Sequence, residues 1–132
     1  MIVDSSALIA ILRNEPTAPI LAECIARAAV CRISAANYVE SAAVIDGSRN
    51  PIASRRFDDL IRTAKIRIEP VTEAQAKFAR QAYYDFGKGS GHAAGLNLGD
   101  CFSYALARDL DEPLLFIGKD FSETDIERAL DI

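Results

Sequence analysis

Four acidic residues stand where a carboxylate could do chemistry, and Asp100 is the first to consider. It lies in residues 96–107, L-N-L-G-D-C-F-S-Y-A-L-A, whose apolar spacing predicts a helix that is buried nearly all round. Buried acids are rare in proteins unless they are paired or bind a metal. Asp100 also stands three residues after Asn97, where it would complete a capping box, so a purely structural role stays open.

Two further acids follow runs that predict buried strands. Asp4 comes directly after the opening M-I-V, and Asp120 follows the apolar run L-L-F-I at 114–117. In an open α/β sheet, ligands bind outside the carboxyl ends of the strands. Both acids are therefore expected at that edge of a sheet, although Asp4 by itself could equally be only a helix cap.

The fourth acid, Glu40, falls inside a helix predicted from Ser34 to about residue 47. It shares a helical stripe with Asn37 and Val44, and no basic residue stands three or four positions after it to form an ion pair. Because its surroundings in the helix are largely apolar, we expect Glu40 to point inward, with a solvent-facing side chain as the alternative.

The elements that must position these acids alternate between strand and helix. Strands are predicted at 1–3, 30–33, 66–69 and 114–117, and helices at 5–12, 17–29, 34–47, 50–64, 72–86 and 96–107. The alternating pattern at 66–69 predicts an edge strand with one wet face. This order indicates an α/β fold with a parallel sheet, which brings the strand ends that precede Asp4 and Asp120 to one edge.

Composition limits the function classes. The 132 residues fit one domain, 1–132, with a hydrophobic share of 50% and no apolar run long enough for a membrane span, so we expect a cytoplasmic protein. The three cysteines show no metal-ligand spacing and are expected to be reduced core thiols. A net charge of −4 argues against a protein that coats nucleic-acid phosphates, so any such contact must use local basic groups.

Carboxylates brought together in this way need a cation. Two of them 4 Å apart repel by about 4 kcal/mol at an effective dielectric of 20. Ligation by oxygen alone, without histidine or cysteine, favours Mg²⁺ or Mn²⁺ over zinc. Such an ion lowers the pKa of a bound water and stabilises in-line displacement at phosphorus, so phosphodiester hydrolysis is the expected chemistry.

The same residues carry a family resemblance. The segments M-I-V-D-S-S-A-L, L-N-L-G-D-C-F-S-Y-A-L-A and L-L-F-I-G-K-D-F, with the lone glutamate after the second strand, resemble a PIN domain of the VapC toxin type. The resemblance implies a three-layer α/β/α fold whose central, mostly parallel sheet has about five strands. It also implies an endoribonuclease of a type II toxin-antitoxin module that depends on Mg²⁺ or Mn²⁺, forms a homodimer and is neutralised by a cognate VapB-type antitoxin.

Matching residue by residue, the resemblance assigns catalysis and metal binding to Asp4, Glu40, Asp100 and Asp120. It gives Ser6 and Asn97 supporting roles beside these acids. Residues outside the match are weaker candidates: Asp125 as an auxiliary ligand, and for guiding the RNA backbone Arg13, Lys88, His92 and Lys119. Between Glu40 and residue 96 the resemblance rests on the order of elements alone.

Two other functions compete with this hypothesis. A receiver-like phospho-acceptor domain also clusters acids at strand ends and has a lysine after its last strand, as Lys119 is here, but no second acid stands beside Asp4. A PIN-like module that binds RNA or protein without cleavage is the other alternative. A phosphatase of the D-x-D type is excluded, because position 6 is serine.

Overall fold

The computed structural model describes all 132 residues, with six α-helices and four short strands. In chain order the elements are β1 (Ile2–Val3), α1 (Ser5–Leu12), α2 (Ala18–Arg27), β2 (Arg32–Ser34), α3 (Ala35–Asp46), α4 (Pro51–Thr63), β3 (Arg67–Glu69), α5 (Glu73–Phe86), α6 (Leu98–Leu110), β4 (Leu114–Leu115) and the 3₁₀ helix η1 (Asp120–Glu123).

The strands form one parallel sheet in the order β3-β2-β1-β4, which confirms the predicted α/β class. The sheet has four strands rather than about five. A fifth is reduced to a single parallel bridge between Leu114 and Arg128. β4 is also shorter than the predicted 114–117, because the backbone N–H of Ile117 bonds the Ser6 hydroxyl, at 3.1 Å, instead of a neighbouring strand.

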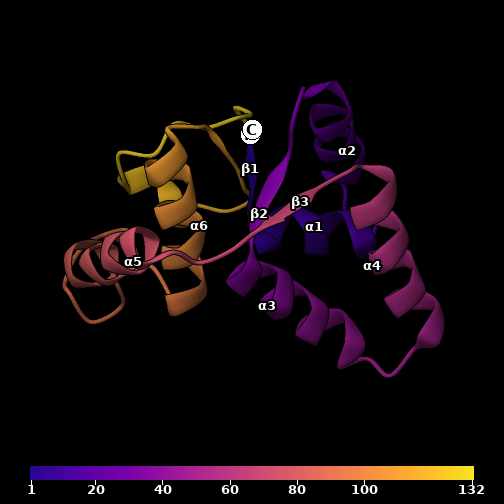
Figure 1. Cartoon of the computed structure of the whole chain (residues 1–132), viewed down its shortest axis with the longest axis horizontal. Coiled ribbons are helices and arrows are strands. Elements are labelled where there is room, and N and C mark those ends of the chain that lie inside the picture. Colours follow the sequence, from indigo (N-terminus) through magenta and orange to yellow (C-terminus); the bar gives the residue numbers. More distant parts are fainter.

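The fold has three layers, in which the sheet lies between α5 and α6 on one face and α1 to α4 on the other (Figure 1). Successive strand residues point to opposite faces. Ile2 and Leu114 therefore pack in the core beneath α5 and α6, while Val3 and Leu115 pack in the core beneath the other helices. Both faces of the central strands are covered, as their continuous apolar runs predict.

Several helix starts lie where the sequence predicts them. Asn50 caps α4 immediately before a proline, and Thr72 caps α5 by accepting a hydrogen bond from Gln75 N–H at 3.2 Å. β3 lies at the edge of the sheet as predicted, but both Arg67 and Ile68 are exposed, so the strand does not have the single wet face that its alternation predicts. The three cysteines are unpaired. None of the helices combines the length and apolar character that crossing a membrane requires.

Two helix faces differ from the prediction. In α3 the buried stripe consists of Asn37, Ser41 and Ile45, four residues apart, so Val44 is exposed. In α5 the apolar spacing predicts that Tyr83 faces inward with Ala79 and Ala82; the two alanines are buried in the core beside α6, but the Tyr83 ring is exposed.

Candidate active site

Asp4 is both a helix cap and a buried acid. It is only 3% exposed and directly follows β1. Its Oδ2 accepts the Ser6 N–H at 3.0 Å, which caps α1, and its Oδ1 accepts the Ser103 hydroxyl at 2.5 Å. Since Ser103 belongs to α6, this second bond fixes the end of β1 against that helix.

Asp100 completes the capping box that its spacing predicts. Its N–H donates to Asn97 Oδ1 at 2.8 Å, and its Oδ2 accepts the Asn97 N–H at 3.0 Å. Ser103, which holds Asp4, stands three residues later on the same face of α6. The cap thus leaves Oδ1 of Asp100 without a protein donor, beside the buried Asp4.

Glu40 lies against the first turn of α6. Its Oε1 accepts the Ser5 hydroxyl at 2.5 Å and the Asn37 amide at 3.3 Å, and the same amide donates to the Gly99 carbonyl at 2.9 Å. A Cβ atom at position 99 would stand 1.9 Å from Glu40 Oε2. Only glycine allows this approach, which brings α3 and its acid next to Asp100.

The electrostatics of these acids reflect their burial and proximity. Burial raises the pKa of Asp100 to about 7, and the charges of Asp4, Asp120 and Glu40 add to the rise against the lowering effect of the Asn97 N–H. Burial also raises the pKa of Asp4, with a smaller contribution from Glu40. None of the ion pairs in the chain includes any of the four acids.

Asp120 belongs to the 3₁₀ helix η1, whereas the sequence predicts it at the end of a strand. β4 ends at Leu115, and Asp120 begins η1 after a short exposed loop rather than ending a strand. It is the most exposed of the four, yet its charge contributes to the raised pKa of Asp100. Asp120 therefore lies on the open side of the cluster.

The donor set suits a hydrated magnesium or manganese ion. No three histidine, cysteine, aspartate or glutamate side chains are already arranged as ligands of one ion. The groups that remain available are carboxylate oxygens: Oδ1 of Asp100 and Oε2 of Glu40 accept no hydrogen bond from the protein. Mg²⁺ binds through one or two carboxylates and retains several waters, so a site for this ion does not require all four acids as direct ligands.

Comparisons with known proteins agree with this geometry. The family model described as PIN domain matches residues 1–127. Ribonuclease VapC28 of Mycobacterium tuberculosis is 58% identical over 131 residues, covering 99% of this chain and 98% of that protein. Ribonuclease VapC of Mycolicibacterium smegmatis is 44% identical over 126 residues, covering 96% and 97%. This chain belongs to the PIN-domain family, in its VapC ribonuclease group.

A solved structure supports the fold of this VapC-type chain. The crystal structure of Mycobacterium tuberculosis VapC20, described as a toxin that cleaves the sarcin-ricin loop, superposes with a TM-score of 0.73 and covers 95% of each chain. At 18% identity this likeness carries the fold alone. The family match and the curated relatives make the chain a toxin endoribonuclease of the VapC type, and the receiver-like alternative is not favoured.

Two of the weaker candidates from the sequence, Asp125 and Arg13, are either already hydrogen-bonded or far from Asp4. Both Asp125 oxygens are engaged, one by the Tyr104 hydroxyl at 2.7 Å and the other by Arg108 at 2.6 Å. Arg13 is at the far end of α1 from Asp4, about 14 Å along the helix axis.

The remaining three, Lys88, His92 and Lys119, are exposed on loops near α6 and η1. Lys88 N–H donates to the Leu96 carbonyl at 2.9 Å, next to the cap of α6. His92 Nδ1 accepts the Ala94 N–H at 3.0 Å. Lys119 directly precedes Asp120 at the start of η1.

Four residues of the site were not identified from the sequence: Ser5, Asn37, Gly99 and Ser103. Each touches one of the acids or its neighbour. Ser103 was accessible in principle, because it stands one helical turn after Asp100 and would share its face. The contact between Ser103 and Asp4 spans 99 residues and requires the tertiary structure.

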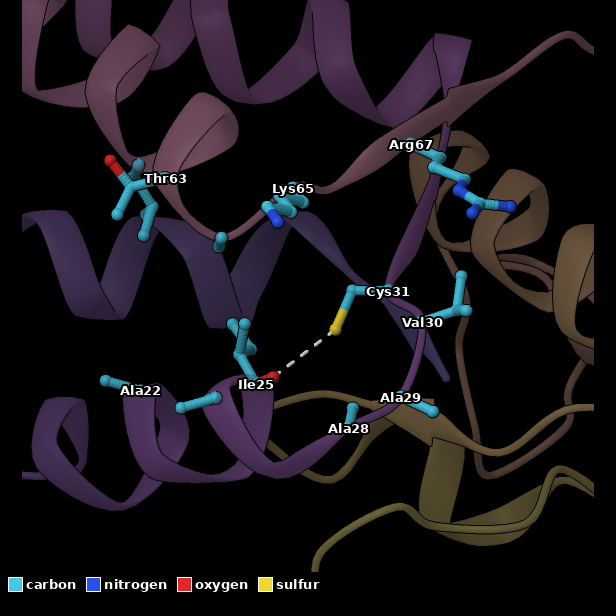
Figure 2. A pocket seen from close by; sticks show the side chains of 12 residues that line it. Ala22, Ile25, Ala28, Ala29, Val30, Cys31, Thr63, Lys65 and Arg67 are labelled. Carbon is cyan, nitrogen blue, oxygen red and sulfur yellow. Dashed lines mark hydrogen bonds between the residues drawn. The ribbon is translucent and has the colours of Figure 1, made fainter.

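An apolar pocket of about 520 Å³ lies elsewhere, between α2 and α4 and the segments leading into β2 and β3 (Figure 2). Ile25, Val30 and Cys31 contribute apolar surface, and Lys65 and Arg67 line one side. Because it is lined by residues that precede β2 and β3, it lies at the amino ends of these strands. Asp4, by contrast, directly follows the carboxyl end of β1, at the opposite edge of the parallel sheet.

Replacing Gly99 by alanine tests the contact with Glu40. The new methyl group would overlap the carboxylate, so we expect Glu40 to move and RNA cleavage to fall by at least tenfold in a protein that remains folded by circular dichroism. Leu98→Ala, an exposed position in the same turn, serves as the control and should retain activity. Normal cleavage by Gly99→Ala would show that Glu40 need not occupy this position.

Proposed function

We propose that this chain hydrolyses RNA phosphodiester bonds at a divalent-metal site formed by Asp4, Glu40, Asp100 and Asp120. The observation that supports this most is the absence of a protein cation among them: a buried acid with a raised pKa and three neighbouring acids form no ion pair with lysine or arginine. Acids in such surroundings are stabilised as carboxylates by a bound cation.

The chain's residues have distinct roles in this proposal. Asp4, Asp100 and Glu40 hold Mg²⁺, or Mn²⁺ in its place, directly or through water, and Asp120 completes the set from its exposed position. The ion supplies Lewis acidity at the scissile phosphate and favours ionisation of water. Ser6 and Asn97 orient Asp4 and Asp100 through their backbone N–H groups, and Asp125 stays an auxiliary residue tied to Tyr104 and Arg108.

Guidance of the RNA backbone falls to exposed basic groups around the acids. Lys119 adjoins Asp120, Lys88 lies beside the cap of α6, and His92 is in the same glycine-rich loop. Arg13, at the opposite end of α1, would contact only a longer RNA. We expect cleavage within the strand that leaves a 5′-phosphate and a 3′-hydroxyl.

The Asp100→Asn variant tests the reaction. It retains an oxygen for the capping box but loses the charge, so we expect RNA cleavage in Mg²⁺ to fall at least a hundredfold without a lower melting temperature. Cleavage by the unchanged protein should stop in EDTA. Asp58→Asn, an exposed acid on α4, is the matched control and should cleave normally. Normal cleavage by Asp100→Asn would refute the site, and an inactive unchanged protein would favour the non-catalytic alternative.

The raised pKa values predict how the stability of the metal-free protein depends on pH. The folded-state pKa of Asp100 is about 7, above the ordinary 3.8, so folded protein retains the proton longer than unfolded protein does. The stabilisation of the folded state from this group is therefore full below pH 3.8 and is lost as pH rises toward 7. Binding of Mg²⁺ to the ionised acids should offset the loss.

Thermal melts with and without Mg²⁺ measure this effect. We expect the rise in melting temperature caused by Mg²⁺ to be larger at pH 8 than at pH 5, and to be absent in Asp100→Asn. An increase of the same size at both pH values would argue that Mg²⁺ binds away from these carboxylates.

We further propose that the toxin is a cytoplasmic homodimer that a VapB-type antitoxin neutralises. An antitoxin arginine or lysine inserted among the acids would supply the missing counter-charge. An apolar antitoxin segment would cover a groove between helices. Exposed apolar residues such as Val39 on α3 and Ile68 on the edge strand offer surface for pairing.

Light scattering and a cleavage assay test the assembly together. The toxin alone at micromolar concentration should have twice the mass of one chain, and the antitoxin complex should be heavier and unable to cleave RNA. A toxin that stays monomeric at these concentrations would contradict the dimer. Cleavage that continues within the complex would contradict neutralisation at the acidic site.

A further inference from the structure

Asn37 is a polar side chain in an unusual position, fully buried on the inward face of α3. Its amide nitrogen donates to the Gly99 carbonyl at 2.9 Å and to Glu40 Oε1 at 3.3 Å. Its own backbone carbonyl accepts the Ser41 hydroxyl at 2.7 Å. Asn37 therefore contacts the acid of α3 and the turn of α6 that carries Asp100.

The orientation of this amide follows from its partners. The Gly99 carbonyl and the Glu40 carboxylate oxygen accept hydrogen bonds, so the amide NH₂ faces them. The Asn37 Oδ1 is consequently left buried without a donor. An unsatisfied buried oxygen destabilises a fold, and an apolar side chain of similar volume would fill the space without this penalty. Packing alone does not account for an asparagine here.

The bonds to Glu40 distinguish its two oxygens. Ser5 and Asn37 both donate to Oε1, while Oε2 accepts no hydrogen bond and lies against Gly99. A glutamate side chain has several rotatable bonds, so a freely moving Glu40 would lose conformational entropy on binding a metal. Donors from α1 and from within α3 hold the carboxylate in place beside Asp100 before any ligand arrives.

We propose that Asn37 is a positioning residue of the nuclease site, which joins Glu40 to the first turn of α6 so that Oε2 is free to bind the metal. The inference rests on the proposed metal-dependent function. Groups that orient ligands commonly contribute ten- to a hundredfold to metal affinity. Loss of the Asn37 amide should therefore weaken metal binding, while the chemistry at saturating metal changes less.

Two variants remove the amide donors in different ways. Asn37→Leu keeps the branched shape of the side chain with a larger volume, and Asn37→Ala removes the donors without adding bulk. The matched control is Ser41→Ala, one turn along the same buried face, which removes a hydrogen bond to the Asn37 backbone without touching a carboxylate. Circular dichroism melts establish which variants are folded, so at least one of the two Asn37 variants reports on the amide.

Mn²⁺ binding, followed by the electron paramagnetic resonance of free Mn²⁺, is the decisive measurement. We expect the dissociation constant to rise about tenfold or more in both folded Asn37 variants and to stay within about twofold in Ser41→Ala. The Mn²⁺ concentration for half-maximal RNA cleavage should rise in parallel, with the rate at saturating Mn²⁺ within about threefold of the unchanged protein.

The outcomes separate this inference from the proposed function. If the unchanged protein binds Mn²⁺ and the Asn37 variants bind it equally well, the positioning role is refuted while the metal site stands. An equal loss of affinity in Ser41→Ala would also refute it, because general loosening of α3 would then explain the result. If the unchanged protein does not bind Mn²⁺, the metal-dependent function itself fails and this inference fails with it.

Discussion

The central physical constraint of this fold is that like charges are buried side by side without a protein cation. Asp4 is buried and Asp100 is partly buried, which disfavours their ionised forms; the charge of Glu40 disfavours both further, and that of Asp120 adds to the effect on Asp100. The chain offsets part of this cost with hydrogen-bond donors rather than with ion pairs. Serine hydroxyls, an asparagine amide and backbone N–H groups face the carboxylates and stabilise them without neutralising the site.

These acids therefore also hold the fold together. Asp4 is the N-cap of α1 and Asp100 closes the capping box in the first turn of α6, so an acid of the site lies at the amino end of each helix. The amino ends of both helices carry partial positive charge, which favours carboxylates there. A capping role and a catalytic role are consequently not alternatives here. The geometry that satisfies the helix end also sets the position of the carboxylate.

Local chemistry made part of this site predictable. The spacing of Asn97 and Asp100 identified the cap, and the M-I-V run placed Asp4 after a strand. Long-range contacts are not visible in the sequence: the predicted stripe of α3 includes Asn37 and Val44, but contacts with other helices bury Ser41 and Ile45 with Asn37 and leave Val44 exposed. The strand after 114 was overestimated because the Ser6 hydroxyl, distant in sequence, captures the Ile117 N–H.

Glycine at position 99 shows that the motif around Asp100 encodes more than an acid. In L-N-L-G-D, asparagine and aspartate close the helix cap, while glycine leaves the space that the Glu40 carboxylate occupies. A side chain at position 99 would overlap the Glu40 carboxylate, which would have to move away from Asp100. The first turn of α6 thus supplies one acid and determines how closely the carboxylate of a second can approach. The distance between these two charges therefore depends on the space that glycine leaves between α3 and α6.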